Sequence, residues 1–380
     1  MTRVIVGFLQ DQGFEVSIAH YMPYSVDPSL SVPTWRIFHD TVKFKTSTKF
    51  SNVKTYEIGA YIPELEWMHY IPNKHWRKLI REHDIHISIS GSVLASLPFV
   101  VMGKKCIAWV ATPFNADRND RVKKFPLIRR FIDTIFDRPV CTYIEKRLLG
   151  RVKVLALSNY TSNQLSKISG VKDIEVMPMF IDEKLFHQKF SIQDPGKLVN
   201  QPMKTKIGFA GRFSDPRKNI LLLLDALRIC ISKKYLINLE LIGDRPTTEV
   251  IEFIKTHKIE KYVLFITHLD RVDLAEYYRS WKIFIIPSTQ EGLAIAGLEA
   301  MACGCAVIST KCGGPEEYVF DLLNGFLVDF DSNYIAEKII NIISDDKILQ
   351  KMQTYSVEII NKNYTKDKVK SIFLNALNNV

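Results

Sequence analysis

Short apolar stretches alternate with amphipathic helical patterns along the whole chain, and this alternation is typical of parallel α/β sheets. In the first half, helical patterns such as 75–83 and 160–169 lie between the apolar stretches. We predict that these stretches form buried strands, at 14–20, 84–90, 105–111 and 152–158.

The second half of the chain restarts this pattern. A polar stretch at 180–204, which contains Pro195 and Gly196, predicts a linker. A long amphipathic helix is expected at 218–234. Strands are expected at 206–211, 236–243, 263–267, 282–288 and 305–310. We therefore predict two doubly wound domains that face a central cleft, with ligands at the carboxyl ends of the strands.

Length and composition agree with two soluble domains. The chain has 380 residues, of which 47% are hydrophobic and 24% charged, so each half can bury its own core. We expect an N-terminal domain, a linker, a C-terminal domain and a final amphipathic helix, at 1–190, 191–204, 205–363 and 364–380.

Targeting and redox signals are weak in this sequence. No apolar run reaches the roughly 18–20 residues that a membrane-spanning helix needs, and the first residues lack a small-residue cleavage site, so we predict a cytoplasmic protein. Scattered cysteines in a chain of this length predict reduced thiols that act as small buried apolar side chains. Cys303, Cys305 and Cys312 do not have the usual zinc spacing and have no histidine nearby, so no metal is expected.

The net charge of +10 favours an anionic partner: nucleic acid, a membrane surface or a phosphorylated substrate. Charge alone does not choose among these three. No nucleic-acid-binding motif accompanies the charge, so we do not expect a nucleic-acid partner.

Cations gather where one predicted strand ends and the next helix begins. Gly211 closes the strand, Arg212 follows it, and Arg217 and Lys218 come at the helix start. Cations in the first turn oppose the helix dipole, so a purely local structure would place acidic residues there. A shared anion such as a diphosphate suits this arrangement. The alternative is a solvated basic loop.

The apolar stretch 289–304 carries two carboxylates, Glu291 and Glu299. Burial of an unpaired carboxylate is costly, so each needs a partner. Gly292 comes after a strand and before a helical pattern, where backbone amides can approach an anion. Hydroxyl groups of a sugar or ribose would donate hydrogen bonds to both carboxylates. The alternative is a helix cap for Glu291 and a buried salt bridge for Glu299.

Taken together, these residues resemble the retaining, GT-B-fold glycosyltransferases of family 4. Glu291 and Glu299 match the E-x7-E signature, and GRFSDPRKN matches the family's G-R-x(4–5)-R-K segment. AMACGCAVISTKCGGPEEYV matches A-M-A-x-G-x-P-V-V-x-x-x-x-G-G-x-x-E, with Ala306 in place of the usual proline. LLNGFLV matches the closing D-G-x-x-G-x-L-V without its first glycine. The resemblance covers about the last 175 residues strongly and the first half in outline.

The resemblance implies a GT-B fold whose C-terminal helix returns toward the first domain. It implies a nucleotide-sugar donor whose diphosphate contacts Arg212 and Lys218, whose sugar contacts Glu291 and whose ribose contacts Glu299. Catalysis would be electrostatic, without a protein nucleophile and without a metal or other cofactor. The remaining donor-binding residues would be Gly211, Gly292, Leu293 and Ala294.

The implied function is transfer of a hexosyl group from a nucleotide-sugar to a glycan or lipid-linked envelope acceptor, with retention of configuration. The first half departs from the family, because many relatives have a histidine where this chain reads WVATPF at 109–114. Without that histidine, the alternative is a GT-B protein that binds a nucleotide-sugar and does not transfer it.

Three polar residues of the first half are candidates for contact with the sugar or the acceptor. Asn115 and Asp117 would orient a hydroxyl group, or else only cap the following helix. His20 ends the strand at 14–20 and is expected to face the cleft, or else to be a structural histidine.

Basic and apolar residues interleave between Arg118 and Lys153. Apolar residues at helical spacing with basic neighbours are typical of a helix that lies on an anionic membrane. The alternative is an ordinary core-facing helix with a solvated face. A peripheral location on the inner face of the membrane would suit a lipid-linked acceptor.

The last expectation concerns the amino end. The resemblance implies an opening strand, a glycine-rich loop, a helix and a second strand. TRVIVGFLQDQG resembles that helix and the stretch 14–20 that second strand, so by this resemblance the first strand and its glycine loop would be missing. We expect a helix at Thr2 to Gln12, a gap in the sheet, and a natural start roughly 15–20 residues earlier.

Overall fold

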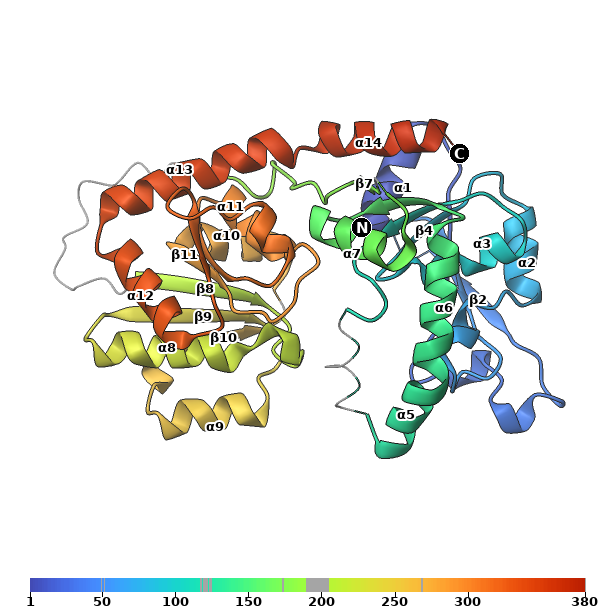
Figure 1. Ribbon diagram of the computed structural model, residues 1–380, viewed down its shortest axis with the longest axis horizontal. Helices are drawn as coiled ribbons and strands as arrows, with labels where there is room; N and C mark the ends of the chain where they lie inside the picture. Colours follow the sequence, from blue (N-terminus) through green and yellow to red (C-terminus); the bar gives the residue numbers. More distant parts are fainter. Residues whose placement is uncertain are drawn as a thin grey trace. The chain divides into compact units, whose positions relative to one another are not determined.

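The computed structural model describes residues 1–379, apart from 49, 51, 117, 119–121, 123, 124, 173, 189–204 and 268. Its contacts divide the chain into two compact units (Figure 1). One contains Met1–Met177 together with Lys370–Val380, and the other is Pro178–Val369. The predicted linker at 191–204 lies outside the described residues, and the predicted domain bounds stay a prediction.

The Pro178–Val369 unit contains a six-stranded parallel sheet with the order β10-β9-β8-β11-β12-β13. The strands are β8 (Thr205–Gly211), β9 (Ile237–Gly243), β10 (Val263–Thr267), β11 (Ile283–Ile286), β12 (Ala306–Thr310) and β13 (Gly325–Val328). Successive strands run outward in one direction from β8 and in the other from β11, so the order reverses between these two strands. Such a reversal is where doubly wound sheets bind ligands.

Helices cover both faces of this sheet, α8 and α12 on one face and α10, α11 and α13 on the other (Figure 1). The helices and helical turns of the unit are η6 (Pro216–Lys218), α8 (Ile220–Ser232), α9 (Thr248–Thr256), η7 (Glu260–Tyr262), α10 (Arg271–Ser280), α11 (Ile295–Ala302), η8 (Gly314–Glu317), α12 (Ser332–Ile343) and α13 (Asp346–Asn363). The five strands predicted for the second half are confirmed. The predicted helix at 218–234 divides into η6 and α8, because Asn219 adopts a left-handed conformation between them, with φ 48°.

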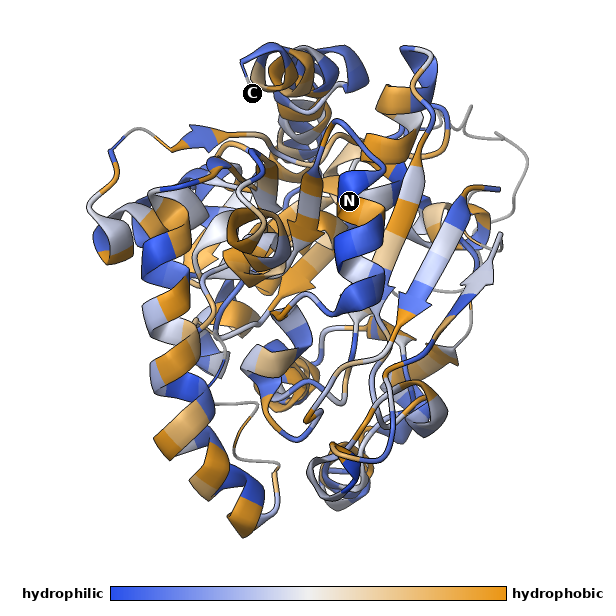
Figure 2. Ribbon diagram, turned by 90° about the vertical axis from the view of Figure 1, so that its right-hand side faces the viewer, coloured by the Kyte–Doolittle hydropathy of each residue, from blue (hydrophilic) through white to orange (hydrophobic). Residues whose placement is uncertain are grey.

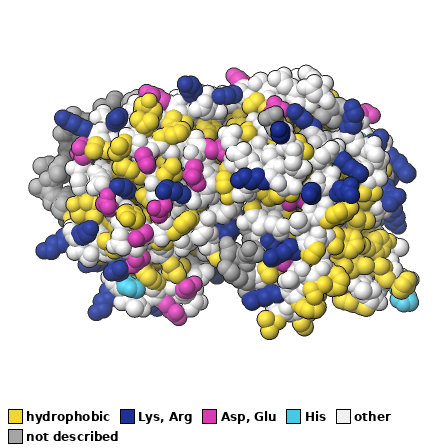
Figure 3. All heavy atoms as spheres, viewed as in Figure 1, with side chains coloured by type: hydrophobic (Ala, Val, Ile, Leu, Met, Phe, Trp, Pro, Cys, Tyr) yellow, Lys and Arg dark blue, Asp and Glu magenta, His cyan; other side chains and the backbone are white. Residues whose placement is uncertain are grey.

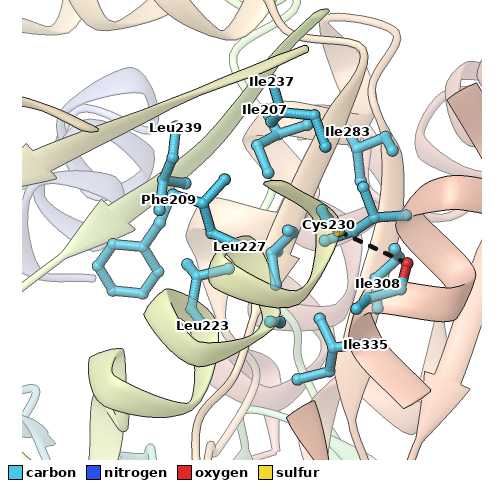
Figure 4. Close-up of a cluster of buried hydrophobic side chains, with 14 of the residues drawn as sticks. Ile207, Phe209, Leu223, Leu227, Cys230, Ile237, Leu239, Ile283, Ile308 and Ile335 are labelled. Carbon is cyan, nitrogen blue, oxygen red and sulfur yellow. Dashed lines mark hydrogen bonds between the residues drawn. The ribbon is translucent and has the colours of Figure 1, made fainter. Parts of the chain in front are cut away.

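The core of this unit lies between α8 and the sheet (Figure 4). Leu223 and Leu227 of α8 are fully buried and point toward the sheet residues Ile207 and Leu239. The thiol of Cys230 donates a hydrogen bond to a backbone carbonyl of α12 at 3.7 Å. All six cysteines of the chain are buried free thiols, as predicted.

The other unit has a sheet of four parallel strands with the order β4-β5-β6-β7, and a second sheet with the order β1-β3-β2. In the second sheet β1 is parallel to β3, whereas β2 is antiparallel to it. The strands are β1 (Ser17–Tyr21), β2 (Phe44–Ser47), β3 (Lys54–Ile58), β4 (Ile87–Ser90), β5 (Ile107–Val110), β6 (Lys153–Ala156) and β7 (Glu175–Val176). The four strands predicted for the first half correspond to β1, β4, β5 and β6.

The helical segments of this unit surround the two sheets. They are α1 (Thr2–Asp11), η1 (Pro28–Leu30), η2 (Thr34–Arg36), η3 (Glu66–Tyr70), α2 (Lys74–Arg81), η4 (Val93–Ser96), α3 (Leu97–Val101), α5 (Leu127–Ile132), the π-helical η5 (Asp133–Asp137), α6 (Arg138–Leu149) and α7 (Asn159–Ser169). In the part of the chain that the structure describes, no helix combines the length and hydropathy needed to cross a bilayer.

The chain ends in α14 (Lys366–Asn378), whose residues from Lys370 onward belong to the first unit. The ring of Phe373 packs against that of Phe8 in α1, with centroids 6.0 Å apart. Lys370 also forms an ion pair with Asp11 at 3.0 Å. The predicted return of the C-terminal helix to the first domain is therefore confirmed.

Candidate functional site

The candidate site of the Pro178–Val369 unit lies at the carboxyl ends of its central strands. Loops that follow β8, β9, β11 and β12 meet there, at the reversal of the strand order. The loop after β11 is fixed to the loop after β12 by two backbone hydrogen bonds: the amide of Glu291 donates to the carbonyl of Cys312 at 2.7 Å, and the amide of Gly314 donates to that of Glu291 at 2.9 Å. Gly314 must be small, because a Cβ atom there would lie 2.4 Å from the carbonyl oxygen of Gly292.

Lys218 and Glu291 form an ion pair across this site. The Lys218 Nζ atom lies 2.6 Å from Glu291 Oε1, and the Ser288 hydroxyl donates to the same oxygen at 2.6 Å. The two charged side chains are only 19% and 13% exposed. The fold thus brings together two residues that lie 73 positions apart in the sequence. The carboxylate of Glu291 binds Lys218 and Ser288 and not the start of α11, so the interpretation of Glu291 as a helix cap is not supported.

Asp215 organises the basic loop after β8. Its carboxylate caps η6 through the amide of Arg217 and binds the guanidinium of Arg217 at 2.7 Å. Burial by itself would raise the pKa of Asp215, but the hydrogen bonds and charge of Arg217 outweigh it, so the pKa is lowered. Arg212 is also within 3.2 Å of Asp215, but its side chain is 70% exposed. The two expected phosphate ligands therefore differ. The side chain of Arg212 is largely exposed, whereas that of Lys218 is already paired with Glu291.

The segment Gly292–Leu293–Ala294 leads into the amino end of α11. Ala294 adopts a left-handed conformation with φ 57°, a costly one for a residue with a side chain. Leu293 is buried, and the hydroxyl of Tyr318 donates to the carbonyl of Ala294 at 3.0 Å. These contacts hold the strained segment in place. The first-turn amides of a helix have no acceptor within the helix, so this end of α11 presents donors suited to an anion.

Glu299 lies further along α11, with 16% of its side chain exposed. Burial raises its pKa to about 7, although the charge of Arg271 and a hydrogen bond from Tyr278 oppose the shift. The hydroxyl of Tyr278 lies 3.3 Å from Oε2, and the guanidinium of Arg271 lies 3.8 Å from Oε1. A salt bridge, the alternative left open by the sequence, is thus present but long and does not offset the cost of burial.

Asp244 is a member of the site that the sequence reasoning missed. It follows β9 and accepts hydrogen bonds from the amides of Phe213 and Ser214 and from the Ser214 hydroxyl. Burial alone would raise the pKa of Asp244, but these hydrogen bonds outweigh it, so the pKa is lowered. Asp244 fixes the loop that carries Arg212. The available signal was a carboxylate directly after a predicted strand that ends in glycine.

The predicted residues of the first unit have other surroundings. Asn115 donates to the Thr142 hydroxyl on α6 at 2.7 Å, so it attaches the loop after β5 to that helix. Asp117 lies outside the described residues. His20 is exposed and lies on a cavity beside β1 in this unit. Glu145, which sequence reasoning missed, accepts from the amide of Phe114 at 2.9 Å. Its pKa is raised to about 7 by burial, despite that hydrogen bond.

Comparison with known proteins identifies a family for the part of the chain that contains this site. Residues 191–358 match the model of the family described as glycosyl transferases group 1. This half of the chain belongs to that family. It is 32% identical over 172 residues to sucrose-phosphate synthase of Zea mays, covering 40% of this chain and 16% of the maize protein. It is 31% identical over 150 residues to the capsular polysaccharide biosynthesis glycosyltransferase CapM of Staphylococcus aureus, covering 37% of each chain. The chain thus spans well under two thirds of the length of these two relatives.

Solved structures extend the likeness to nearly the whole chain. Sucrose-phosphate synthase from Thermosynechococcus elongatus matches 97% of this chain and 89% of its own, with a TM-score of 0.69 and 18% identity. HepE of Anabaena, solved in complex with UDP, matches 80% of this chain and 82% of its own, with a TM-score of 0.65 and 18% identity. At this identity the likeness shows the fold alone, and the predicted GT-B fold is confirmed.

Proposed function

We propose that this group 1 family member is a retaining glycosyltransferase that takes a sugar from a nucleotide diphosphate. The observation that carries the proposal is the Lys218–Glu291 pair, which lies at 2.6 Å where the strand order reverses. The family match and the UDP complex of the Anabaena neighbour support a nucleotide-sugar, with UDP as the first donor to test.

The proposed binding mode begins with the charges around the leaving group. A bound diphosphate would compete with Glu291 for Lys218 and attract the exposed guanidinium of Arg212. Glu291, released in part from Lys218, would accept a hydrogen bond from a sugar hydroxyl. The amides at the start of α11 would hold the distal phosphate, so that donors surround the diphosphate as the glycosidic bond breaks.

Ribose is the partner that we assign to Glu299. Hydroxyl groups would donate to a carboxylate that has only a 3.3 Å contact with Tyr278 and a 3.8 Å contact with Arg271. These new hydrogen bonds favour the ionised form, so donor binding would lower the pKa of this group from about 7.

The proposal is tested by release of UDP from UDP-sugars in the presence of candidate glycan acceptors. Lys218→Ala should lose turnover, whereas Lys206→Ala should retain it, because Lys206 lies at the opposite end of β8 and pairs with Glu240 at 2.9 Å. A nucleotide that raises the Tm without any turnover would favour the alternative, a binding protein without transferase activity. Failure of every nucleotide and nucleotide-sugar to bind would refute both.

For the acceptor we propose a glycan or lipid-linked molecule of the cell envelope, used at an anionic membrane surface. The CapM likeness supports an envelope glycan. Support for the membrane comes from α5, where Leu127, Ile128 and Phe131 are 79%, 78% and 62% exposed. Figure 3 shows hydrophobic side chains at the lower tip of this unit, with Lys and Arg beside them. Exposure of this kind argues against the alternative of an ordinary core-facing helix.

One member of the predicted basic cluster does not contribute to that surface. Arg118 is 1% exposed, and its guanidinium binds Glu66 at 2.5 Å and Asp133. Lys123 and Lys124 lie outside the described residues. The membrane proposal therefore rests on the apolar side chains of α5 and the cations beside them, Arg129 and Arg130.

A further inference from the structure

Helix α2 of the first unit is held in place by its apolar side and by a cap at its amino end. Ile80 is buried, and Trp76 and Leu79 pack against a small buried core cluster of this unit. The side chain of Asn73 accepts from the amides of His75 and Trp76 at 3.0 and 3.4 Å. The helix lies on the outside of the unit next to α3 (Figure 1). Figure 2 shows this unit facing the viewer, with hydrophilic and hydrophobic residues alternating along its outer helices.

The opposite side of α2 carries cations and no carboxylate. Lys74, Arg77, Lys78 and Arg81 are exposed, and their spacing places them within about 100° of arc around the helix. Each of them has a like-charged neighbour three or four positions away, and such pairs repel. Lys74 and Arg77 also lie in the first turn, where the helix dipole disfavours cations. A solvated helix face normally mixes both signs of charge, so this stripe of one sign is unfavourable in the free protein.

The protein neutralises little of this charge. Glu82, which follows α2 directly, lies 3.8 Å from the Lys78 amine, and the two side chains are 50% and 75% exposed. The guanidinium of Arg77 donates to the backbone carbonyl of Pro72 at 3.1 Å, which is an uncharged acceptor. Among the described residues, no carboxylate forms an ion pair with Arg77 or with the two outermost cations of the stripe. An exposed pair with Glu82 contributes little, so most of the positive charge of α2 is available to a ligand.

The same side chains line a depression on the surface of α2. Its volume is about 360 Å³, and its lining consists of the four cations and Glu82. This volume lies within the range of sites for small molecules. None of the five residues is aromatic, so the depression offers no surface on which a nucleic-acid base could stack. The apolar side of α2 is packed against the protein, so it is not available for insertion into a bilayer.

We propose that this depression, the α2 site, binds a small soluble molecule that carries several adjacent phosphate groups. Arg77 and Arg81 would each bind two phosphate oxygens through the fork of the guanidinium, and Lys74 and Lys78 would supply further charge. Such a ligand would replace repulsion along the helix by attraction. The proposal does not rest on the proposed function, because the Lys218–Glu291 pair belongs to the Pro178–Val369 unit.

The test measures the binding of tripolyphosphate by calorimetry, in a buffer free of divalent cations. The α2 variant has Gln in place of all four cations of the stripe. A charge-matched control has Gln in place of four exposed lysines of the other unit, Lys233, Lys255, Lys347 and Lys362. Glu82→Gln removes the carboxylate from the α2 site, and Lys218→Ala removes a cation from the proposed donor site. Circular dichroism and the Tm without ligand check that each variant is folded.

Wild type should bind tripolyphosphate, and the α2 variant should bind it about a hundredfold more weakly, because four charge-assisted contacts are lost. The charge-matched control and Lys218→Ala should keep the wild-type affinity. Glu82→Gln should bind about fivefold more tightly, because a charge that repels the ligand is removed. Without ligand, the α2 variant should have a Tm equal to that of wild type or higher, because the like-charge pairs are gone.

Several results would overturn the proposal. Absence of binding to wild type, or equal binding to the α2 variant, would do so directly. Loss of all binding in Lys218→Ala would place tripolyphosphate in the donor site alone, and equal losses in the α2 variant and the control would show attraction by net charge only. If the α2 variant does not fold, Glu82→Gln decides, and an unchanged or weaker affinity contradicts the proposal.

Vesicles of phosphatidylcholine and phosphatidylglycerol in equal parts test the other source of phosphate. If the stripe binds these vesicles but not tripolyphosphate, its occupant is a membrane surface and the proposal is wrong. None of these results requires UDP or a UDP-sugar to bind, so failure of this proposal and failure of the proposed function are distinguishable.

Discussion

Replacement of Glu299 by Gln should make the protein more stable at alkaline pH. The folded pKa of Glu299 is raised from its ordinary value of 4.5 to about 7, so the folded state holds a proton that the unfolded state has released between these two values. The contribution of Glu299 to the free energy of unfolding therefore falls as the pH rises from about 4.5 to about 7, and it is constant above pH 7. The difference between these two pKa values corresponds to about 3 kcal/mol. Gln keeps the shape and an acceptor for Tyr278 but cannot ionise.

The assay is thermal unfolding of wild type and Glu299→Gln between pH 5 and pH 8.5, without ligand. For a unit of this size, 1 kcal/mol corresponds to roughly 2–4 °C, so the two Tm values should be similar at pH 5 and differ by about 6–12 °C at pH 8.5. Glu252→Gln, at an exposed position on α9, is the matched control and should follow wild type. Parallel curves for wild type and Glu299→Gln would refute the reasoning. A variant that is markedly less stable at pH 8.5 would show instead that the 3.8 Å contact with Arg271 is a stabilising salt bridge.

The remaining predictions concern ligand and membrane binding. Arg212→Ala should weaken UDP binding by about 1.5–3 kcal/mol and leave the Tm without ligand unchanged, because its side chain is 70% exposed; equal UDP affinity by calorimetry would refute the phosphate role. In wild type, UDP affinity should rise as the pH increases through about 7, because the ribose hydroxyls favour ionised Glu299. In Glu299→Gln, UDP affinity should not change over this pH range. The same pH dependence of UDP affinity in both proteins would place the ribose elsewhere. Combined replacement of Leu127, Ile128 and Phe131 by Ser should reduce cosedimentation with anionic vesicles, whereas Phe38→Ser, at a position 94% exposed on the same unit, should not. No sedimentation of wild type, or no effect of the triple change, would remove the membrane proposal.

The fold could be predicted from the sequence because parallel strands buried on both faces are continuous apolar runs. The runs at 236–243 and 282–288 became β9 and β11, with every residue of β11 buried. Strand β2, Phe44–Ser47, gave no such signal, because none of its residues is buried and it lies at the edge of its sheet. Its position depends on pairing with β3, which local sequence patterns do not encode.

The candidate site was only partly predictable, for a related reason. Motifs identified Lys218 and Glu291 as separate residues, but their pairing depends on the adjacent positions of β8 and β11 in the sheet. Asp244 was missed because its role is to accept hydrogen bonds from the loop after β8, and that contact appears only once β8 and β9 are side by side. Residue types can be read from the sequence, but the contacts that set their charge and orientation follow from strand order.

Two unfavourable features of the Pro178–Val369 unit lie in or next to α11. Ala294, at its start, holds a left-handed conformation that costs about 1–3 kcal/mol. Glu299, within it, holds a carboxyl group whose ionisation is opposed by burial. The core of the unit, in contrast, is made of apolar side chains. Local strain and unfavourable burial persist in proteins mainly where function requires them. A bound nucleotide-sugar would relieve the cost at Glu299 by donating hydrogen bonds and would use the amides that the Ala294 conformation presents. Part of these two costs would thereby be recovered on donor binding.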